Sequence, residues 1–201
     1  MTTSVLTPLS SALSATDTPT LGQMMAWWEA MWADPTDLQT AFADGFPSEL
    51  EDFLALLRDT ERLFWMYLKD QEPLGAFWLH DLLHDETGGL CGGWLGVHII
   101  QAARGPYSWA SGEIIRQTLI AAGLAHVFAA VNVDNRRSQA YVRRGLRFPR
   151  AADYKQFTLF KGQPTDVIIY SWRQDDHQLA LTEARKRAAR NMASLYEIAM
   201  A

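Results

Sequence analysis

The segment 131–148, VNVDNRRSQAYVRRGLRF, combines side chains able to carry acid–base chemistry with signals for a strand, a turn and a short helix. Asp134 or Asn135 can cap the helix that follows, and Gly145 is placed to end it in the left-handed conformation. Tyr141 lies within that helix, and a positioned tyrosine hydroxyl can donate a proton to a leaving group. The alternative is that Tyr141 packs its ring on a sheet and forms a local hydrogen bond.

Hydrophobic periodicity predicts the elements that must position this segment. Apolar residues at helical spacing predict a helix from Thr20 that ends at Asp34-Pro35. Ser48 with Glu51 is typical of a capping box at the start of a second helix. Predicted strands follow at 63–69, 74–83, 90–101, 126–133, 154–161 and 165–172, with a turn at 71–73 and helices at 111–123, 136–144 and 176–201. Runs of strands interrupted by single crossover helices predict a mixed sheet with helices on both faces.

The length of 201 residues fits one domain of ordinary size with extra elements at its ends. Residues 1–19 are rich in Ser, Thr and Pro, which predicts a flexible or partner-held arm. Residues 20–172 form the predicted domain, and residues 173–201 a C-terminal amphipathic helix. Hydrophobic residues make up 48% of the chain, which is enough for a substantial core.

Composition and charge exclude several classes of protein. The net charge of -5 argues against a general nucleic-acid binder, which is normally basic. No apolar run approaches the roughly 20 residues of a membrane span, so we expect no membrane partner. The one cysteine, Cys91, excludes an internal disulfide and fits a reducing compartment, so we expect a cytoplasmic protein. His80 and His84 lie four residues apart, but no third ligand is evident and we expect no metal site.

The order of these elements resembles that of the GNAT family, the acyl-CoA-dependent N-acyltransferases. The family often carries, after its fifth strand, an Asn, a small residue and then a Tyr four residues before a Gly-Phe. Asn135, Ser138, Tyr141 and Gly145 fit this pattern, with one residue fewer between Asn and Tyr than is common and Leu146 in place of Phe. The resemblance implies a GNAT-like α/β fold with a mixed, mostly antiparallel sheet flanked by helices, an extended N-terminal arm and a C-terminal helix.

The resemblance also implies roles for particular residues. Tyr141 would be the general acid for the thiolate that leaves acetyl-CoA, and His98, with Asn132, would serve as the base toward an acceptor amine. The alternative for His98 is a hydrogen-bonded histidine on a half-buried strand. The residues expected to contact acetyl-CoA are Ile99, Ile100 and Gln101 through the strand backbone, Arg104 and Gly105 in the pyrophosphate loop, and Asn135 and Ser138 after the fifth strand.

The pyrophosphate loop departs from the family pattern. GNAT enzymes carry Arg/Gln-x-x-Gly-x-Gly/Ala before the third helix, where glycines let phosphates approach outward-pointing backbone amides. The matching segment here is RGPYSWASGE, in which Tyr107 and Trp109 stand where the family has small residues and Pro106 lacks an N–H. A bulky pair at this place is expected to obstruct phosphate approach.

Two functions from different classes follow from these observations. The first is an N-acyltransferase that moves an acetyl group from acetyl-CoA to a small-molecule or protein amine. The second is a non-catalytic GNAT-like interaction protein, similar to GNAT-like domains without an intact CoA loop that tailed phages encode, including components of the virion. In that case the N-terminal arm, the first helix and the C-terminal helix would bind partner chains.

Overall fold

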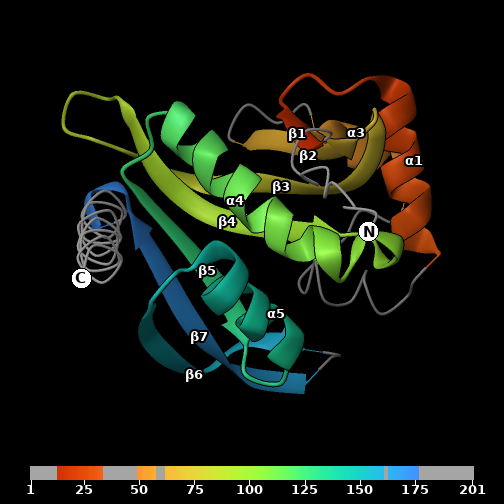
Figure 1. The fold of residues 1–201 in the computed structure, drawn as a ribbon. Coiled ribbons are helices and arrows are strands. Elements are labelled where there is room, and N and C mark those ends of the chain that lie inside the picture. Colours follow the sequence, from red (N-terminus) through yellow and green to blue (C-terminus); the bar gives the residue numbers. More distant parts are fainter. Residues whose placement is uncertain (1–12, 34–48, 58–61, 161–162, 177–201) are drawn as a thin grey trace, which may run out of the picture.

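The fold is known from a computed structural model, which describes residues 13–33, 49–57, 62–160 and 163–176 (Figure 1). The elements are, in chain order, β1 (Leu13–Thr16), α1 (Leu21–Trp32), α3 (Leu50–Leu57), β2 (Leu63–Lys69), β3 (Glu72–His84), β4 (Leu90–Ile99), η2 (Gln101–Ala103), α4 (Pro106–Ala121), β5 (His126–Asn132), α5 (Arg136–Ala140), η3 (Tyr141–Leu146), β6 (Arg150–Phe160) and β7 (Gln163–Arg173). Within these described ranges, no helix has both the length and the apolar character needed to cross a membrane.

The strands form one seven-stranded sheet in the order β1-β2-β3-β4-β5-β7-β6. Every neighbouring pair is antiparallel except β4 and β5, which run parallel and are connected by α4. A parallel pair needs such a crossover connection. The predicted mixed, mostly antiparallel α/β fold is therefore confirmed.

Strand alternation divides the core between the two faces of the sheet. One face packs against α4 and η3, and the other against α1 and α3 (Figure 1). The α4 face buries Trp65, Phe77, Leu79, Leu95, Ile115, Leu119, Val127, Val142, Leu146 and Phe148 among others. The α1 face buries Trp27, Trp28, Met31, Phe53, Met66, Leu68, Ala76 and Trp78. The candidate site residues discussed below are divided between these two faces.

Helix α4 begins five residues earlier than the sequence pattern predicted. Pro106 occupies its first turn, where a missing N–H costs nothing and the fixed φ favours a helix. Gly105 precedes it with φ 95°, and its amide donates to the Ser108 hydroxyl (3.2 Å). The segment read as a loop with bulky residues is thus the first turn of a helix, and Trp109 lies on that helix.

The turn predicted at 71–73 is shifted toward the N-terminus and shares only Gln71 with the observed one. The chain reverses at Asp70 and Gln71, both with positive φ (50° and 71°), as the favoured two-residue hairpin turns require. Glu72 and Pro73 already belong to β3 and lie opposite Lys69 and Leu68. The sequence pattern placed the turn too late because Pro73 favours a turn and neither Asp70 nor Gln71 is a glycine.

The structure describes only parts of the elements that were predicted near the two chain ends. Within the segment expected to be an arm, residues 13–16 form β1, which pairs with β2 at the edge of the sheet. The predicted cap at Ser48 lies outside the described residues, although the helix it was expected to start is present as α3. The predicted C-terminal helix lies outside the described residues beyond residue 176.

The sequence predicted that Gly145 ends its helix in the left-handed conformation, and this prediction is wrong. It lies inside the π-helical turn η3, and Arg147 adopts the left-handed conformation instead (φ 59°). Gly145 faces α4, where a Cβ on Gly112 would lie 2.4 Å from the Gly145 carbonyl oxygen. The pair lets η3 and α4 approach backbone to backbone, which explains both glycines by packing and not by φ.

Thr20 starts α1 as predicted and offers a test of the local sequence signal. Its hydroxyl accepts from the Gln23 amide (3.2 Å), and the Gln23 side chain accepts from the Thr20 amide (2.9 Å). Thr20→Ala removes the first of these bonds, so we expect a loss of about 1 kcal/mol in the free energy of unfolding. Urea denaturation of the two proteins measures the difference, and an unchanged midpoint would show that this cap contributes nothing.

Candidate active site

The parallel strands β4 and β5 pair only near their starts. Gly92, Gly93 and Trp94 lie opposite residues 126–128, and the pairing goes no further. Both strands continue, β4 to Ile99 alongside β3 and β5 to Asn132 alongside β7. The two halves of the sheet therefore diverge along the second half of these strands.

The Ile100 amide donates to the Leu74 carbonyl (3.0 Å), which fixes the peptide groups of β4 that face β3. Peptide groups alternate in direction along an antiparallel ladder. Those of Leu95, Val97 and Ile99 therefore face away from β3, toward β5. Where β4 and β5 no longer pair, these groups form a strand edge with which an extended ligand chain can pair.

The backbone contacts predicted for residues 99–101 are therefore not equivalent. Ile99 faces the diverging edge, and its carbonyl accepts from Arg104 Nε (3.2 Å). Ile100 is turned to β3 through its amide, and its carbonyl accepts from the Ala103 amide (2.9 Å). The Gln101 carbonyl accepts from the Arg104 amide (3.2 Å) within η2. The Arg104 side chain thus folds back on β4, next to the edge it was predicted to serve.

Helix α4 begins at Pro106, after β4 ends at Ile99 and η2 at Ala103, so its N-terminus lies close in sequence to the end of this edge. Such an N-terminus carries outward amides and the positive end of the helix dipole, which suits an anionic group. The two bulky residues of the first turns contact neighbouring elements. The Tyr107 ring lies 5.2 Å from Lys69 Nζ, and Trp109, which is 49% exposed, lies beside Gly145 of η3. Their predicted obstruction of a phosphate group stays a prediction that ligand binding can test.

Tyr141, the first residue of η3, lies against α4 with its hydroxyl 2.8 Å from Ser111 Oγ. Ser111 donates its own proton to the Ser108 carbonyl (2.8 Å), so Tyr141 is the donor in the bond between the two hydroxyls. Burial raises the pKa of Tyr141, which the Ser111 hydrogen bond lowers only in part. The phenol is therefore protonated throughout the neutral range, which is the state a general acid needs.

A second phenol, that of the buried Tyr67 of β2, lies near the start of α4. Its hydroxyl donates to the Tyr107 carbonyl (3.2 Å), and burial, with a smaller contribution from Tyr107, raises the pKa of Tyr67 to about 12. Tyr67 and Tyr141 interact electrostatically. Two neutral phenols thus contact the first turns of α4, Tyr67 through the Tyr107 carbonyl and Tyr141 through Ser111.

These two phenols predict a loss of stability in alkali. An unfolded tyrosine ionises near pH 10, whereas the folded pKa of both Tyr67 and Tyr141 is higher. Above pH 10 the folded state therefore holds protons that the unfolded state loses. The free energy of unfolding should fall by up to about 1.4 kcal/mol per pH unit for each tyrosine. Urea denaturation at pH 9, 10 and 11 measures this slope. Tyr67→Phe should make the slope shallower, and equal slopes would contradict the assignment.

Asn135 caps α5, as the sequence predicted. Its Oδ1 accepts from the Ser138 amide (3.1 Å), which explains the predicted Asn and small-residue pair by local geometry. Gln139 then donates its side-chain amide to the carbonyls of Asn132 (3.2 Å) and Val133 (2.6 Å). This clamp holds the end of β5 against α5, next to Tyr141.

His98 lies on the opposite face of the sheet, beneath α1. It is 5% exposed, and its Nδ1 accepts from the Trp27 indole N–H (2.9 Å). Because an indole nitrogen only donates, neutral His98 carries its proton on Nε2. A proton taken up at Nδ1 would displace Trp27. This geometry accords with the alternative role for His98, a hydrogen-bonded histidine within a packed strand.

The structure thus brings Tyr141 close to Ser111 and Arg116, two residues for which the sequence predicted no contact with its helix. Ser111 accepts from its hydroxyl, and the buried Arg116 donates to the Gly145 carbonyl and pairs with Glu113. The hydrogen bonds from Tyr141 to Ser111 and from Arg116 to Gly145 join residues 29 or more positions apart. A single sequence gives no pattern that predicts such contacts. The one available signal was Arg116 itself, a charged residue on the apolar side of an amphipathic helix.

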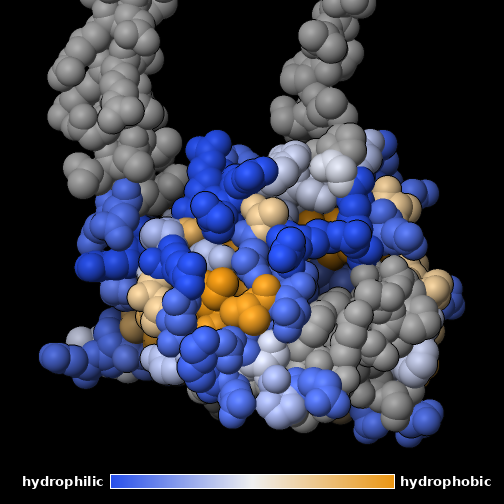
Figure 2. All heavy atoms as spheres, turned by 90° about the horizontal axis from the view of Figure 1, so that it is seen from below, coloured by the Kyte–Doolittle hydropathy of each residue, from blue (hydrophilic) through white to orange (hydrophobic). Residues whose placement is uncertain are grey.

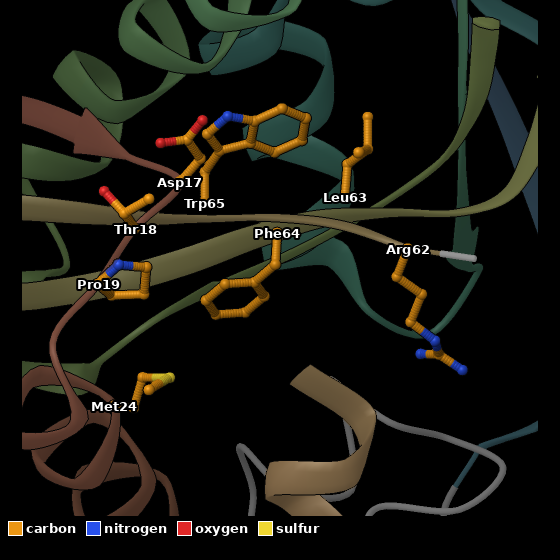
Figure 3. Close-up of a pocket in the computed structure, with 8 residues that line it drawn as sticks. All are labelled: Asp17, Thr18, Pro19, Met24, Arg62, Leu63, Phe64 and Trp65. Carbon is orange, nitrogen blue, oxygen red and sulfur yellow. The ribbon is translucent and has the colours of Figure 1, made fainter. Parts of the chain in front are cut away.

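A cavity of about 360 Å³ lies elsewhere, at the outer edge of β2 where β1 ends (Figure 3). In Figure 3, Asp17 and Trp65 lie on one side of the β2 ribbon, and Phe64 and Met24 on the other. None of the predicted site residues is among those that line it. The cavity therefore contributes nothing to the site around Tyr141.

Comparison with known proteins establishes the fold. No protein-family model matches the sequence, and no curated protein matches it. Among solved structures, a probable acetyltransferase of the GNAT family from Chromobacterium violaceum has a TM-score of 0.68 and 17% sequence identity, over 83% of this chain and 85% of that one. Mycobacterium smegmatis RimJ in complex with CoA-disulfide has a TM-score of 0.67 and 14% identity, over 85% and 89%. Vibrio cholerae spermidine N-acetyltransferase in complex with CoA and spermine has 0.66 and 12%, over 82% and 97%. The chain therefore has the GNAT fold.

Proposed function

We propose that this protein is an N-acetyltransferase that moves an acetyl group from acetyl-CoA to an amine. The observation that carries the proposal is the divergence of β4 and β5 between the N-terminus of α4 and the phenol of Tyr141. The diverging edge, the helix N-terminus and a neutral phenol are the groups that a thioester of CoA requires. Structural neighbours with the same fold contain CoA. An active site also has to be argued from its own residues, because a fold hosts many functions.

The residues of the chain would divide the work as follows. The peptide group of Val97 faces the diverging edge and can pair with the amide-bearing arm of CoA. At the start of α4, Pro106 has no N–H and the Gly105 and Ser108 amides form intramolecular hydrogen bonds. The positive end of the helix dipole there favours the pyrophosphate. Acetyl-CoA, when bound, supplies the acetyl group as an activated thioester. Tyr141 holds a proton on its hydroxyl that can pass to the departing sulfur, in place of the bond it makes to Ser111.

The base toward the amine is not assigned to His98, whose Nδ1 is engaged by Trp27. Asn132 lies at the end of β5, with its carbonyl held by Gln139 and by the Asn135 amide (3.0 Å). We propose that the Asn132 side chain orients the acceptor or a water molecule, and that the amine attacks in its neutral form. The proton that the nitrogen loses on forming the amide passes through water to the solvent, and Tyr141, which gives its proton to the sulfur, regains one from the solvent. A ternary complex with direct attack of the amine on the thioester fits this division.

The proposal is tested by calorimetric titration with acetyl-CoA. Val97→Pro removes one N–H that faces β5 and leaves the ladder with β3 intact, and the preceding Gly96 tolerates a following proline. Val97→Thr keeps the N–H and is the matched control. We expect micromolar binding by the wild type and by Val97→Thr, and at least tenfold weaker binding by Val97→Pro. Absence of binding by the wild type and by Trp109→Gly would favour a non-catalytic GNAT-like interaction protein instead.

A further inference from the structure

The charges of this chain are distributed unevenly. Residues 136–150 contain six arginines, no lysine and no acidic residue. This leaves 12 of the 18 basic residues to set against all 23 acidic ones in the rest of the chain. The net charge of -5 led us to expect no nucleic-acid binding, but it conceals a strongly basic segment within an acidic protein.

The structure places these arginines together on the surface. In α5 and η3, residues that face the sheet and α4 recur at helical spacing and include the buried Val142, Gly145 and Leu146. The arginines occupy the opposite side and are all exposed: Arg136, Arg137, Arg143, Arg144 and Arg147. We call these five residues the arginine face. At a rise of about 1.5 Å per residue it is roughly 16 Å long, enough for several phosphates of one strand.

Intramolecular pairing does not explain this arrangement. Arg150, just beyond the face, pairs with Asp153, and Arg116 beneath it pairs with Glu113. Across the ranges that the structure describes, no salt bridge engages Arg136, Arg137, Arg143 or Arg144. Like charges this close repel one another, which lowers the stability of the free protein and favours an anionic partner.

An exposed aromatic ring borders the arginine face. Trp109 is 49% exposed and lies beside Gly145, with its Cε3 3.4 Å from the place a Cβ on that residue would occupy. Figure 2, which views the molecule from below, the side of α5 and β6 in Figure 1, shows mostly hydrophilic residues on this side. Guanidinium groups bind phosphates in a bidentate manner, and an exposed ring offers a platform on which bases stack.

From the arginine face and Trp109 we propose that this surface binds single-stranded nucleic acid through its phosphates and stacked bases. Arginines alone do not distinguish a nucleic acid from an acidic peptide, because guanidinium groups bind both phosphates and carboxylates. The exposed ring of Trp109 adds a surface on which bases can stack, and this favours nucleic acid. The arginine face lies on α5 and the η3 segment, away from the β4 edge, whereas Trp109 lies in the first turns of α4, next to the proposed pyrophosphate site. The two proposals therefore share Trp109 but not the arginines.

The test is fluorescence anisotropy with a fluorescein-labelled 20-nucleotide single-stranded RNA. We expect micromolar binding at 50 mM salt, and about four phosphate contacts would give log K against log salt a slope of about -3. Arg137→Gln with Arg144→Gln should weaken binding at least tenfold and make the slope shallower by about 1.4. Trp109→Ala should weaken it by about tenfold without changing the slope. Tyr141→Phe should bind normally, which separates this proposal from the proposed catalysis.

A matched control carries the same change in net charge. Lys69→Gln with Lys155→Gln removes two positive charges from β2 and β6, outside the arginine face, and should leave RNA binding within twofold. No anisotropy change at 50 µM protein, or equal losses in the two double variants, would overturn the proposal. Tighter binding of a polyglutamate peptide than of RNA would also overturn it and assign the surface to an acidic protein. Competition by equimolar adenosine 3′,5′-bisphosphate would overturn it by assigning the arginines to the nucleotide end of CoA.

Discussion

Replacing Tyr141 by phenylalanine is expected to lower kcat for acetyl transfer by roughly two to four orders of magnitude, the usual contribution of a positioned general acid. The phenol is the group in the candidate site whose proton is available over the whole neutral range, because burial raises the pKa of Tyr141. The hydroxyl also has one defined donor bond, to Ser111, that can be exchanged for the departing sulfur. Steady-state release of the free thiol of CoA, followed with a thiol reagent, measures the change.

The matched control for this variant is Tyr67→Phe. Tyr67 is the other phenol near the start of α4 whose pKa is raised, and its hydroxyl donates to the Tyr107 carbonyl (3.2 Å). Its loss should lower the free energy of unfolding by about 1 kcal/mol and change kcat by no more than a few-fold. If Tyr141→Phe keeps wild-type kcat, or if both variants lose equal activity, Tyr141 is not the acid. Wild-type affinity for CoA in Tyr141→Phe shows that the variant site has kept its shape.

Features fixed by neighbouring residues could be predicted from the sequence. The cap on α1 depends on Thr20 and Gln23, and the cap on α5 on Asn135 and Ser138, three residues apart in both cases. Strand β2 was predicted with its exact bounds, because an apolar run rich in β-propensity needs little context. The order of strands and crossover helices then limits the topology, so the fold followed from local signals.

Features fixed by contacts distant in sequence could not be predicted. His98 and Trp27 are 71 residues apart, and only the packing of α1 on β4 shows that they share a hydrogen bond. Gly145 has a familiar local explanation as a helix end, whereas its actual reason is the approach of Gly112 in α4. Rules based on neighbouring residues explain a glycine by its backbone conformation. Here the glycine is needed because two helices pack closely, and that cannot be predicted from neighbouring residues.

The start of α4 shows how a resemblance can mislead about local structure. Comparison with the family's glycine-rich loop predicted that Tyr107 and Trp109 obstruct a phosphate group. It also treated Pro106 only as a residue that lacks an N–H donor. The same proline, read on its own, is a helix-start signal at the first helical position. The preference of proline for the first helical position therefore predicts the start of α4 correctly. This preference depends on the backbone alone and holds for any ligand that the N-terminus binds.

Gly112→Ala is expected to have the largest effect on stability, and it tests whether the contact between α4 and η3 builds the site. A Cβ at residue 112 would lie 2.4 Å from the Gly145 carbonyl oxygen, a backbone atom that cannot rotate aside. Alanine gains up to about 1 kcal/mol of helix propensity over glycine, but separation of the two helices should cost more, for a net loss of about 2–3 kcal/mol. Because η3 carries Tyr141 and α4 carries Ser111, the same separation should also lower kcat. Urea denaturation and the thiol assay measure the two effects.

Gly22→Ala provides the matched control, since it makes the same substitution in α1 at an exposed position. A Cβ there meets nothing nearer than Thr20 Oγ1 at 4.0 Å, so we expect unchanged activity and a gain of a few tenths to about 1 kcal/mol. If Gly112→Ala were as stable as Gly22→Ala, η3 would be free to shift, and the hydrogen bond between Tyr141 and Ser111 would not be held by the helix contact. If Gly112→Ala lost stability but kept full kcat, the position of Tyr141 against α4 would not matter for transfer. A loss of both is expected only if the contact that excludes a methyl group is also the one that positions the acid.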